Sequence, residues 1–167
     1  MVRSFRWAAT AFLFLILDSQ SGLAVCLTTL APNPPFLPSE PYLSAIAEPG
    51  RSPMLVNATL YGSDALWTMI PLNGTWNELP RNANGYRQKV FWWSEPGSER
   101  QSKLVLTGRR LDGDSQSIAV MEVTNPYDPF GVGSARLTMV DIPTGGCWEL
   151  TGHYAGRTLS FVVMVEP

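Results

Sequence analysis

The chain has 167 residues, of which 45% are hydrophobic and 16% charged, and its formal net charge is −2 at pH 7. This length and composition allow one domain with a buried core. The basic residues are spread along the chain and form no patch, which excludes DNA or RNA binding as its function.

The N-terminus has the order of a secretory signal: Arg3 and Arg6, an apolar run over residues 7–17, and a polar stretch over 18–21. The apolar run is shorter than the about 20 residues that span a bilayer. We therefore predict a signal helix over residues 1–24, cleaved after Ala24, and a protein exported to the periplasm or cell envelope.

Two alternatives to simple cleavage remain open. One is an uncleaved anchor. The other is lipidation of Cys26, because residues 23–26 resemble the lipobox of bacterial lipoproteins, although Val25 replaces the small residue which that pattern prefers.

Cys26 and Cys147 are the two cysteines, and an exported chain meets an oxidising environment that permits a disulfide between them. In the chain-entropy description, closing a loop of roughly 120 residues stabilises a fold by about 4 to 5 kcal/mol. The alternative is a buried Cys147 thiol with Cys26 lipidated or unpaired.

Residues 25–54 form a proline-rich segment. Seven prolines lie from Pro32 to Pro53, which predicts extended backbone and no helix. The segment is either a tether or a strap that docks on the domain. Its apolar residues favour docking: Phe36, Leu37, Tyr42, Leu43 and Ile46.

From residue 55 to 167, short β-branched and aromatic runs alternate with Gly, Asn, Asp and Pro, which predicts an all-β, Ig-like antiparallel sandwich. Strands are expected at 55–61, 66–70, 88–93, 104–108, 118–124, 135–142, 147–154 and 158–165. Turns are expected at 62–64, 73–74, 82–85, 96–97, 112–114 and 143–146.

The last two strands form a hairpin whose faces follow from alternation. The predicted core face consists of Trp148, Leu150, Gly152, Tyr154, Leu159, Phe161, Val163 and Val165. Ala155 and Gly156 supply a tight turn, unless Arg157 widens it to three residues. Cys147 is then directed outward, where the proline-rich segment can reach it, unless a bulge at Gly145-Gly146 reverses the phase.

Several blocks of the chain resemble an uncharacterised family of exported bacterial proteins, often from acidobacteria. They cover most of the chain after the signal, and they are 61–68, 73–76, 85–93, 106–112 and the Gly146-Cys147-Trp148-Glu149-Leu150-Thr151-Gly152 block. The resemblance implies a signal, an N-terminal cysteine, a proline-rich segment and an Ig-like domain. It implies no activity, cofactor or catalytic residue.

Phe91, Trp92 and Trp93 are adjacent and cannot all face one side of a strand. At least one of them leaves the core and is either exposed or covered by the proline-rich segment. Exposed aromatics on a β-sandwich stack on sugar rings, so these three are candidate ligand-stacking residues of a carbohydrate-binding module.

Catalytic and metal-binding motifs are weak. His153 is the one histidine, no Gly-x-Ser-x-Gly motif is present, and a Cys147–His153 pair would need a free thiol. Two distant cysteines and one histidine give no metal-ligand spacing, and the Asp112-Gly113-Asp114 turn lacks the twelve-residue calcium-loop pattern.

We therefore predict no catalytic residue, metal or cofactor. The expected function is a non-catalytic envelope domain acting in binding or assembly, with an envelope protein or glycan as partner. A carbohydrate-binding module and a hydrolase that uses His153 are the alternatives.

Overall fold

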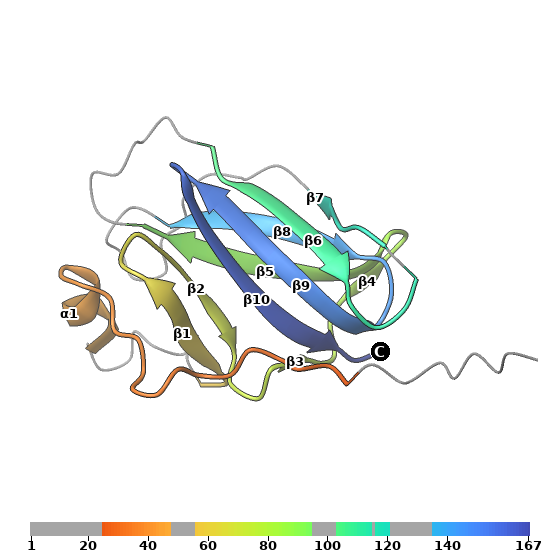
Figure 1. Ribbon diagram of the computed structural model, residues 1–167, viewed down its shortest axis with the longest axis horizontal. Helices are drawn as coiled ribbons and strands as arrows, with labels where there is room; N and C mark the ends of the chain where they lie inside the picture. The colour runs from red at the N-terminus through yellow and green to blue at the C-terminus, as the bar shows by residue number, and fades with distance from the viewer. Residues whose placement is uncertain (1–24, 48–55, 95–102, 115, 121–134) are drawn as a thin grey trace, which may run out of the picture.

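Two β-sheets pack face to face in the computed structural model (Figure 1), which describes residues 25–47, 56–94, 103–114, 116–120 and 135–167. The predicted signal, the turn at 96–97 and the end of the strand expected at 118–124 lie outside these residues.

The larger sheet has the strand order β1-β2-β5-β8-β7, with β4 also paired to β5. Its strands are β1 (Ala58–Ser63), β2 (Leu66–Pro71), β4 (Arg81–Asn82), β5 (Gly85–Trp93), β7 (Ala119–Val120) and β8 (Arg136–Ile142). The smaller sheet has the order β3-β10-β9-β6. Its strands are β3 (Thr75–Trp76), β6 (Val105–Arg110), β9 (Gly146–Tyr154) and β10 (Arg157–Val165).

The predicted all-β sandwich is confirmed. Each predicted strand overlaps an observed one, and the pairings are antiparallel except for the short β3–β10 pair, which is parallel. The strands β3 and β4 are missing from the prediction because two residues are too few to show an alternating pattern.

The C-terminal hairpin folds as expected. Arg157 pairs with Tyr154, so Ala155 and Gly156 alone make the turn, with φ angles of 47° and 73°. Both angles are positive, as a two-residue turn between right-twisted strands requires.

The predicted core face of the hairpin is buried between the sheets, with Trp148, Leu150 and Val163 fully inaccessible. Gly152 fits this face because a Cβ there would lie 2.6 Å from the Trp92 ring. Leu159 is the partly buried member of the set.

A short helix, α1 (Tyr42–Ala47), corrects the expectation that prolines exclude helix from residues 25–54. Pro41 immediately precedes the helix, where its fixed φ suits the first turn and its missing N–H is not needed. The Glu40 carboxylate accepts hydrogen bonds from the Ser44 N–H and hydroxyl at 3.2 and 2.9 Å.

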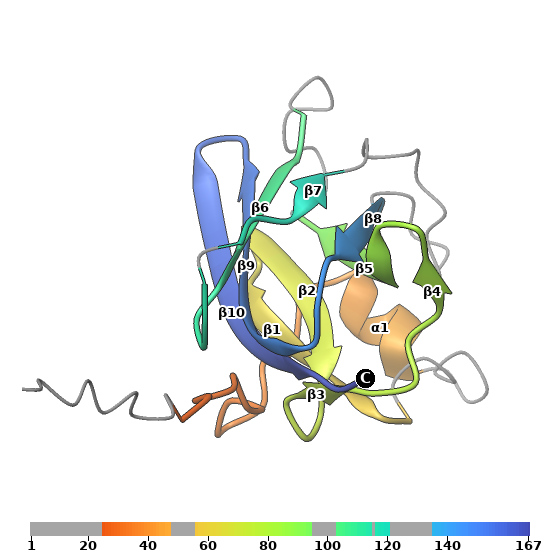
Figure 2. The same ribbon diagram turned by 90° about the vertical axis from the view of Figure 1, so that its right-hand side faces the viewer.

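Residues 25–47, which we call the strap, pass around one edge of the sandwich (Figure 2). The strap starts on the outer face of the smaller sheet and ends with α1 on the outer face of the larger sheet. There Tyr42 and Ala45 pack with Leu60, Trp67 and Trp93 in a second apolar cluster, separate from the core between the sheets. The larger sheet is therefore covered on both faces over part of its area.

Candidate functional site

A disulfide joins Cys26 of the strap to Cys147 of β9, with 5.5 Å between the two Cα atoms and 121 residues between them in sequence. Cys147 shares the outer face of β9 with Glu149 and Thr151, as alternation predicts. It is nevertheless only 1% exposed. Of the alternatives left open for the two cysteines, the structure has the disulfide, and the predicted outward direction of Cys147 is confirmed.

The disulfide occupies the sulfur that lipidation would need. The Cys26 Sγ is bonded to its own Cβ and to the Cys147 Sγ, so it has no valence left for a thioether to a lipid. Disulfide formation and lipidation at Cys26 thus exclude each other in one molecule, and the structure contains the disulfide.

Hydrogen bonds attach the strap at two further places. The Thr29 N–H donates to the Val162 carbonyl at 2.8 Å, and the Val162 N–H donates to the Thr29 hydroxyl at 2.8 Å, along the edge of β10. The N–H and hydroxyl of Ser39 both donate to the Asp64 carboxylate at 2.7 Å. Over the described residues, the strap is docked on the sandwich at both ends and in between.

The aromatic run of β5 divides between two faces. Trp92 lies in the core between the sheets and donates from its indole N–H to the Thr138 hydroxyl at 3.2 Å. Trp93 lies on the outer face, stacked on Trp67 with ring centroids 4.4 Å apart. Tyr42 of α1 packs edge-on against Trp67 at 5.3 Å.

Trp92 and Trp93 are both 0% exposed, which corrects their assignment as ligand-stacking residues. One is covered by the facing sheet and the other by the strap helix, so neither ring has a free surface. Phe91 alone of the three is partly exposed, and it stacks on Trp93 at a centroid distance of 5.8 Å.

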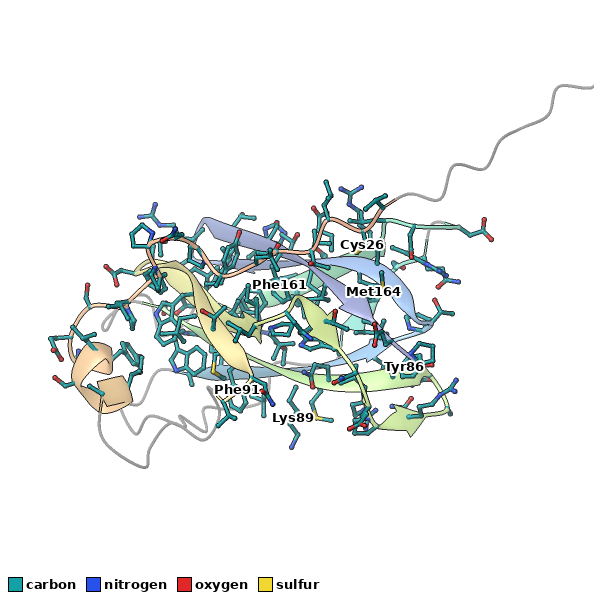
Figure 3. All side chains as sticks on the ribbon, turned by 90° about the horizontal axis from the view of Figure 1, so that it is seen from below. Cys26, Tyr86, Lys89, Phe91, Phe161 and Met164 are labelled. Carbon is teal, nitrogen blue, oxygen red and sulfur yellow. A yellow bond between two sulfur atoms is a disulfide. The ribbon has the colours of Figure 1, made fainter. Side chains whose placement is uncertain are left out.

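Phe91 borders a groove where the larger sheet splits. The strand β2 pairs with β5 only at Trp67–Trp93 and Thr68–Trp92. Beyond Thr68 the two strands are unpaired, and a groove of about 300 Å³ lies among β2, β5 and the chain that follows β3. Figure 3 shows Phe91 and Lys89 on the outer side of the sheet, away from Phe161 in the core.

Side chains replace the missing strand partner of β5 at the split. The Thr68 hydroxyl donates to the Phe91 carbonyl at 2.6 Å, and the Lys89 N–H donates to the Gln88 Oε1 at 3.0 Å. The split therefore leaves these two backbone groups satisfied, and the groove is lined by side chains.

Three side-chain amides line the groove: Asn57, Asn77 and Gln88. We did not predict these residues as a site, because they lie far apart in the sequence and line one groove only through the split of the sheet. The apolar part of the lining includes Met69, Trp76 and Phe91, and Lys89 is the one ionisable residue among the described lining residues.

A second, wider cavity of about 630 Å³ lies between the strap and the tips of two hairpins. Phe36, Tyr61 and Arg157 are among its lining residues. The Thr158 hydroxyl on its wall already contacts the His153 Nδ1 at 3.1 Å. Fewer polar side chains are therefore left for a ligand here than in the groove at the sheet split.

The geometry corrects the idea of a Cys147–His153 catalytic pair. The thiol is consumed by the disulfide. His153 is exposed six residues further along the same strand, which at the strand rise corresponds to about 20 Å. The pair is thus too far apart for proton transfer.

The turn after β6 is held by its own ion pair. Arg110 donates to the Asp112 carboxylate at 2.8 Å. Burial raises the pKa of Asp112, but hydrogen bonds from Arg110 and from the Cys147 N–H outweigh it and leave the pKa below its usual value. Within the described ranges, no group of three or more His, Cys, Asp or Glu side chains is placed to hold a metal ion.

Asp141 is the most strongly bonded carboxylate that the structure describes. It is 2% exposed and receives two hydrogen bonds from Arg87, at 2.8 and 3.0 Å. Asn82 and Asn84 donate to it at 2.8 and 3.3 Å. The bonds from Arg87 lower the pKa of Asp141 most, burial acts to raise it, and the two amides lower it further.

Asp141→Asn is expected to lower the free energy of unfolding at pH 7 by about 2 kcal/mol, since it removes a charge-assisted pair with the partly exposed Arg87. Folding lowers the pKa of Asp141. The contribution of this carboxylate to the free energy of unfolding is therefore complete above its unfolded-state pKa of about 4, and it is lost progressively as the pH falls below that value. Urea titrations at pH 7, 5 and 3 check this. If the free energies of unfolding of Asp141→Asn and the parent differ as much at pH 3 as at pH 7, the prediction is wrong.

No helix among the described residues is both long and apolar enough to cross a membrane. No protein-family model matches the chain, and no curated protein matches it. One solved structure to which it is similar is described as "Putative Lipoprotein from Bacillus anthracis". The two chains are 15% identical, with a TM-score of 0.39, over 65% of this chain and 78% of that one.

Proposed function

We propose that the chain is an exported, non-catalytic binding domain of the bacterial periplasm or cell envelope. The observation that supports this most is the disulfide between Cys26 and Cys147. Disulfides persist in oxidising compartments and are rare in the cytosol, where thiols are kept reduced.

The place of Cys26 strengthens the argument. It lies two residues after the predicted cleavage site at Ala24, and a charged, apolar and polar sequence precedes that site. The disulfide thus joins the expected N-terminus of the mature protein to the folded domain. A chain that kept Cys26 for a lipid would lose this attachment.

Export of the full chain in a bacterial host with a periplasm tests the proposal. We expect a periplasmic protein that starts at Val25 and whose two cysteines resist iodoacetamide until they are reduced, as read by intact mass. The Cys147→Ser variant is the matched control, because it should expose one alkylatable thiol at Cys26.

One outcome would contradict export, and another would contradict the disulfide at Cys26. A cytosolic protein with both thiols reactive would contradict export. A membrane-bound protein with a lipid mass at Cys26 would replace the disulfide by the lipidated alternative.

Binding, in this proposal, uses a surface of the sandwich and no covalent chemistry. The carbohydrate-binding alternative retains Phe91 from its three original aromatics, since that ring is partly exposed beside the groove. The hydrolase alternative has lost its thiol to the disulfide.

A further inference from the structure

We infer that the groove at the split of the larger sheet binds a neutral saccharide. The inference rests on the proposed binding function and names its ligand class. The groove of about 300 Å³ lies at the lower end of the size range of small-ligand sites. Its walls come from β2, β5 and the segment after β3, which are held by sheet pairing on either side.

The amides of the groove carry the argument. The side chains of Asn57 and Asn77 make no hydrogen bond with any residue that the structure describes, and both are exposed. Gln88 uses its Oε1 to accept from the Lys89 N–H, which leaves its amide N–H groups to donate. An amide presents donors and an acceptor in one plane, which matches the neighbouring hydroxyls of a sugar.

Phe91 supplies the apolar surface that one face of a sugar ring needs. Its stacking on Trp93, at an interplanar angle of 22°, fixes the orientation of the ring. Trp93 is in turn held by Trp67 under α1. The Phe91 ring beside the groove is therefore held in place by buried aromatics, and little side-chain conformational entropy is lost when a ligand binds.

The charge of the lining side chains and the hydrogen bonding of the β5 backbone both favour a neutral saccharide over an extended peptide. Among the lining residues that the structure describes there is no carboxylate, and the one ammonium group, from Lys89, can donate to a hydroxyl. An extended peptide would need unpaired strand edges. Lys89 and Phe91 turn four backbone groups to this edge, and two of them, the Phe91 carbonyl and the Lys89 N–H, are already bonded to Thr68 and Gln88, so an added strand would make fewer hydrogen bonds than usual.

The test is a titration of the full chain, exported and oxidised, with cellotriose and chitotriose as neutral probes. Trigalacturonate and trialanine are the acidic and peptide probes. We expect a neutral probe to shift the side-chain amide signals of Asn57, Asn77 and Gln88 in ¹H–¹⁵N NMR spectra. Asn77→Ala should raise the Kd about five- to tenfold, which is the loss of one hydrogen bond.

Matched variants separate binding from folding. Phe91→Ala should weaken binding more than Phe91→Leu, since leucine retains an apolar surface without a ring. Lys89→Ala should weaken binding, whereas Lys103→Ala, at the other exposed lysine, should not.

Three results would overturn the inference: no shift of the groove amides with either neutral probe, shifts with only the acidic or peptide probe, or equal affinity of Asn77→Ala and the parent. In an exported, oxidised protein each of these leaves the proposed function standing. A reduced protein retained in the cytosol contradicts the proposed function whatever the titrations show.

Discussion

Cys147→Ser is expected to lower the free energy of unfolding by about 4 to 5 kcal/mol. The bond it removes closes a loop of 121 residues, and the entropy that the unfolded chain regains grows with loop length. This is a large share of the about 5 to 15 kcal/mol by which domains are stable. Urea unfolding followed by tryptophan fluorescence measures it.

The control for this experiment is the double variant Cys26→Ser/Cys147→Ser, which should be as stable as either single variant because one bond is lost in each. The parent protein unfolded in reducing agent should match all three. A loss below about 1 kcal/mol in the single variants would show that the disulfide does not constrain the unfolded chain as described.

Trp67→Ala should lower the free energy of unfolding by about 3 to 5 kcal/mol, the usual cost of removing a large buried aromatic. Trp67 is 1% exposed and lies at the centre of the outer cluster. It contacts Phe36 and Tyr42 of the strap as well as Trp93 of β5. Its removal should therefore also loosen α1.

Hydrogen exchange in α1, together with urea unfolding, measures both effects. The disulfide at Cys26 should keep the start of the strap attached in Trp67→Ala, so the rise in exchange should be confined to α1 and the chain next to it. Leu72→Ala is the control, because Leu72 is 55% exposed and its truncation should cost less than about 0.5 kcal/mol. Unchanged exchange in α1 of Trp67→Ala would contradict the role given to the outer cluster.

The parts of the fold that follow from the sequence are those set by neighbours along the chain. Alternation between Trp148 and Tyr154 and the turn at Gly156 specify the last hairpin, including the outward direction of Cys147. The adjacency of Phe91, Trp92 and Trp93 shows that aromatic side chains lie on both faces of the strand. It does not show what covers the second face.

The parts that do not follow depend on contacts between distant segments. The helix α1 forms where Pro41 starts it and where Trp67 offers a surface for Tyr42, and the second condition is not visible in the proline content. The groove exists because β2 and β5 part after Thr68, so its amides come together from three separate stretches. Neither residue spacing nor periodicity encodes that parting.

The disulfide also changes what a protease can do to this protein. Cys26 and Cys147 make the chain between them a covalent ring, and the ring contains every strand of the sandwich except the last two, apart from the start of β9. A single cut anywhere within the ring opens a loop but releases no fragment. A nicked molecule therefore keeps its mass, apart from one added water, until the disulfide is reduced.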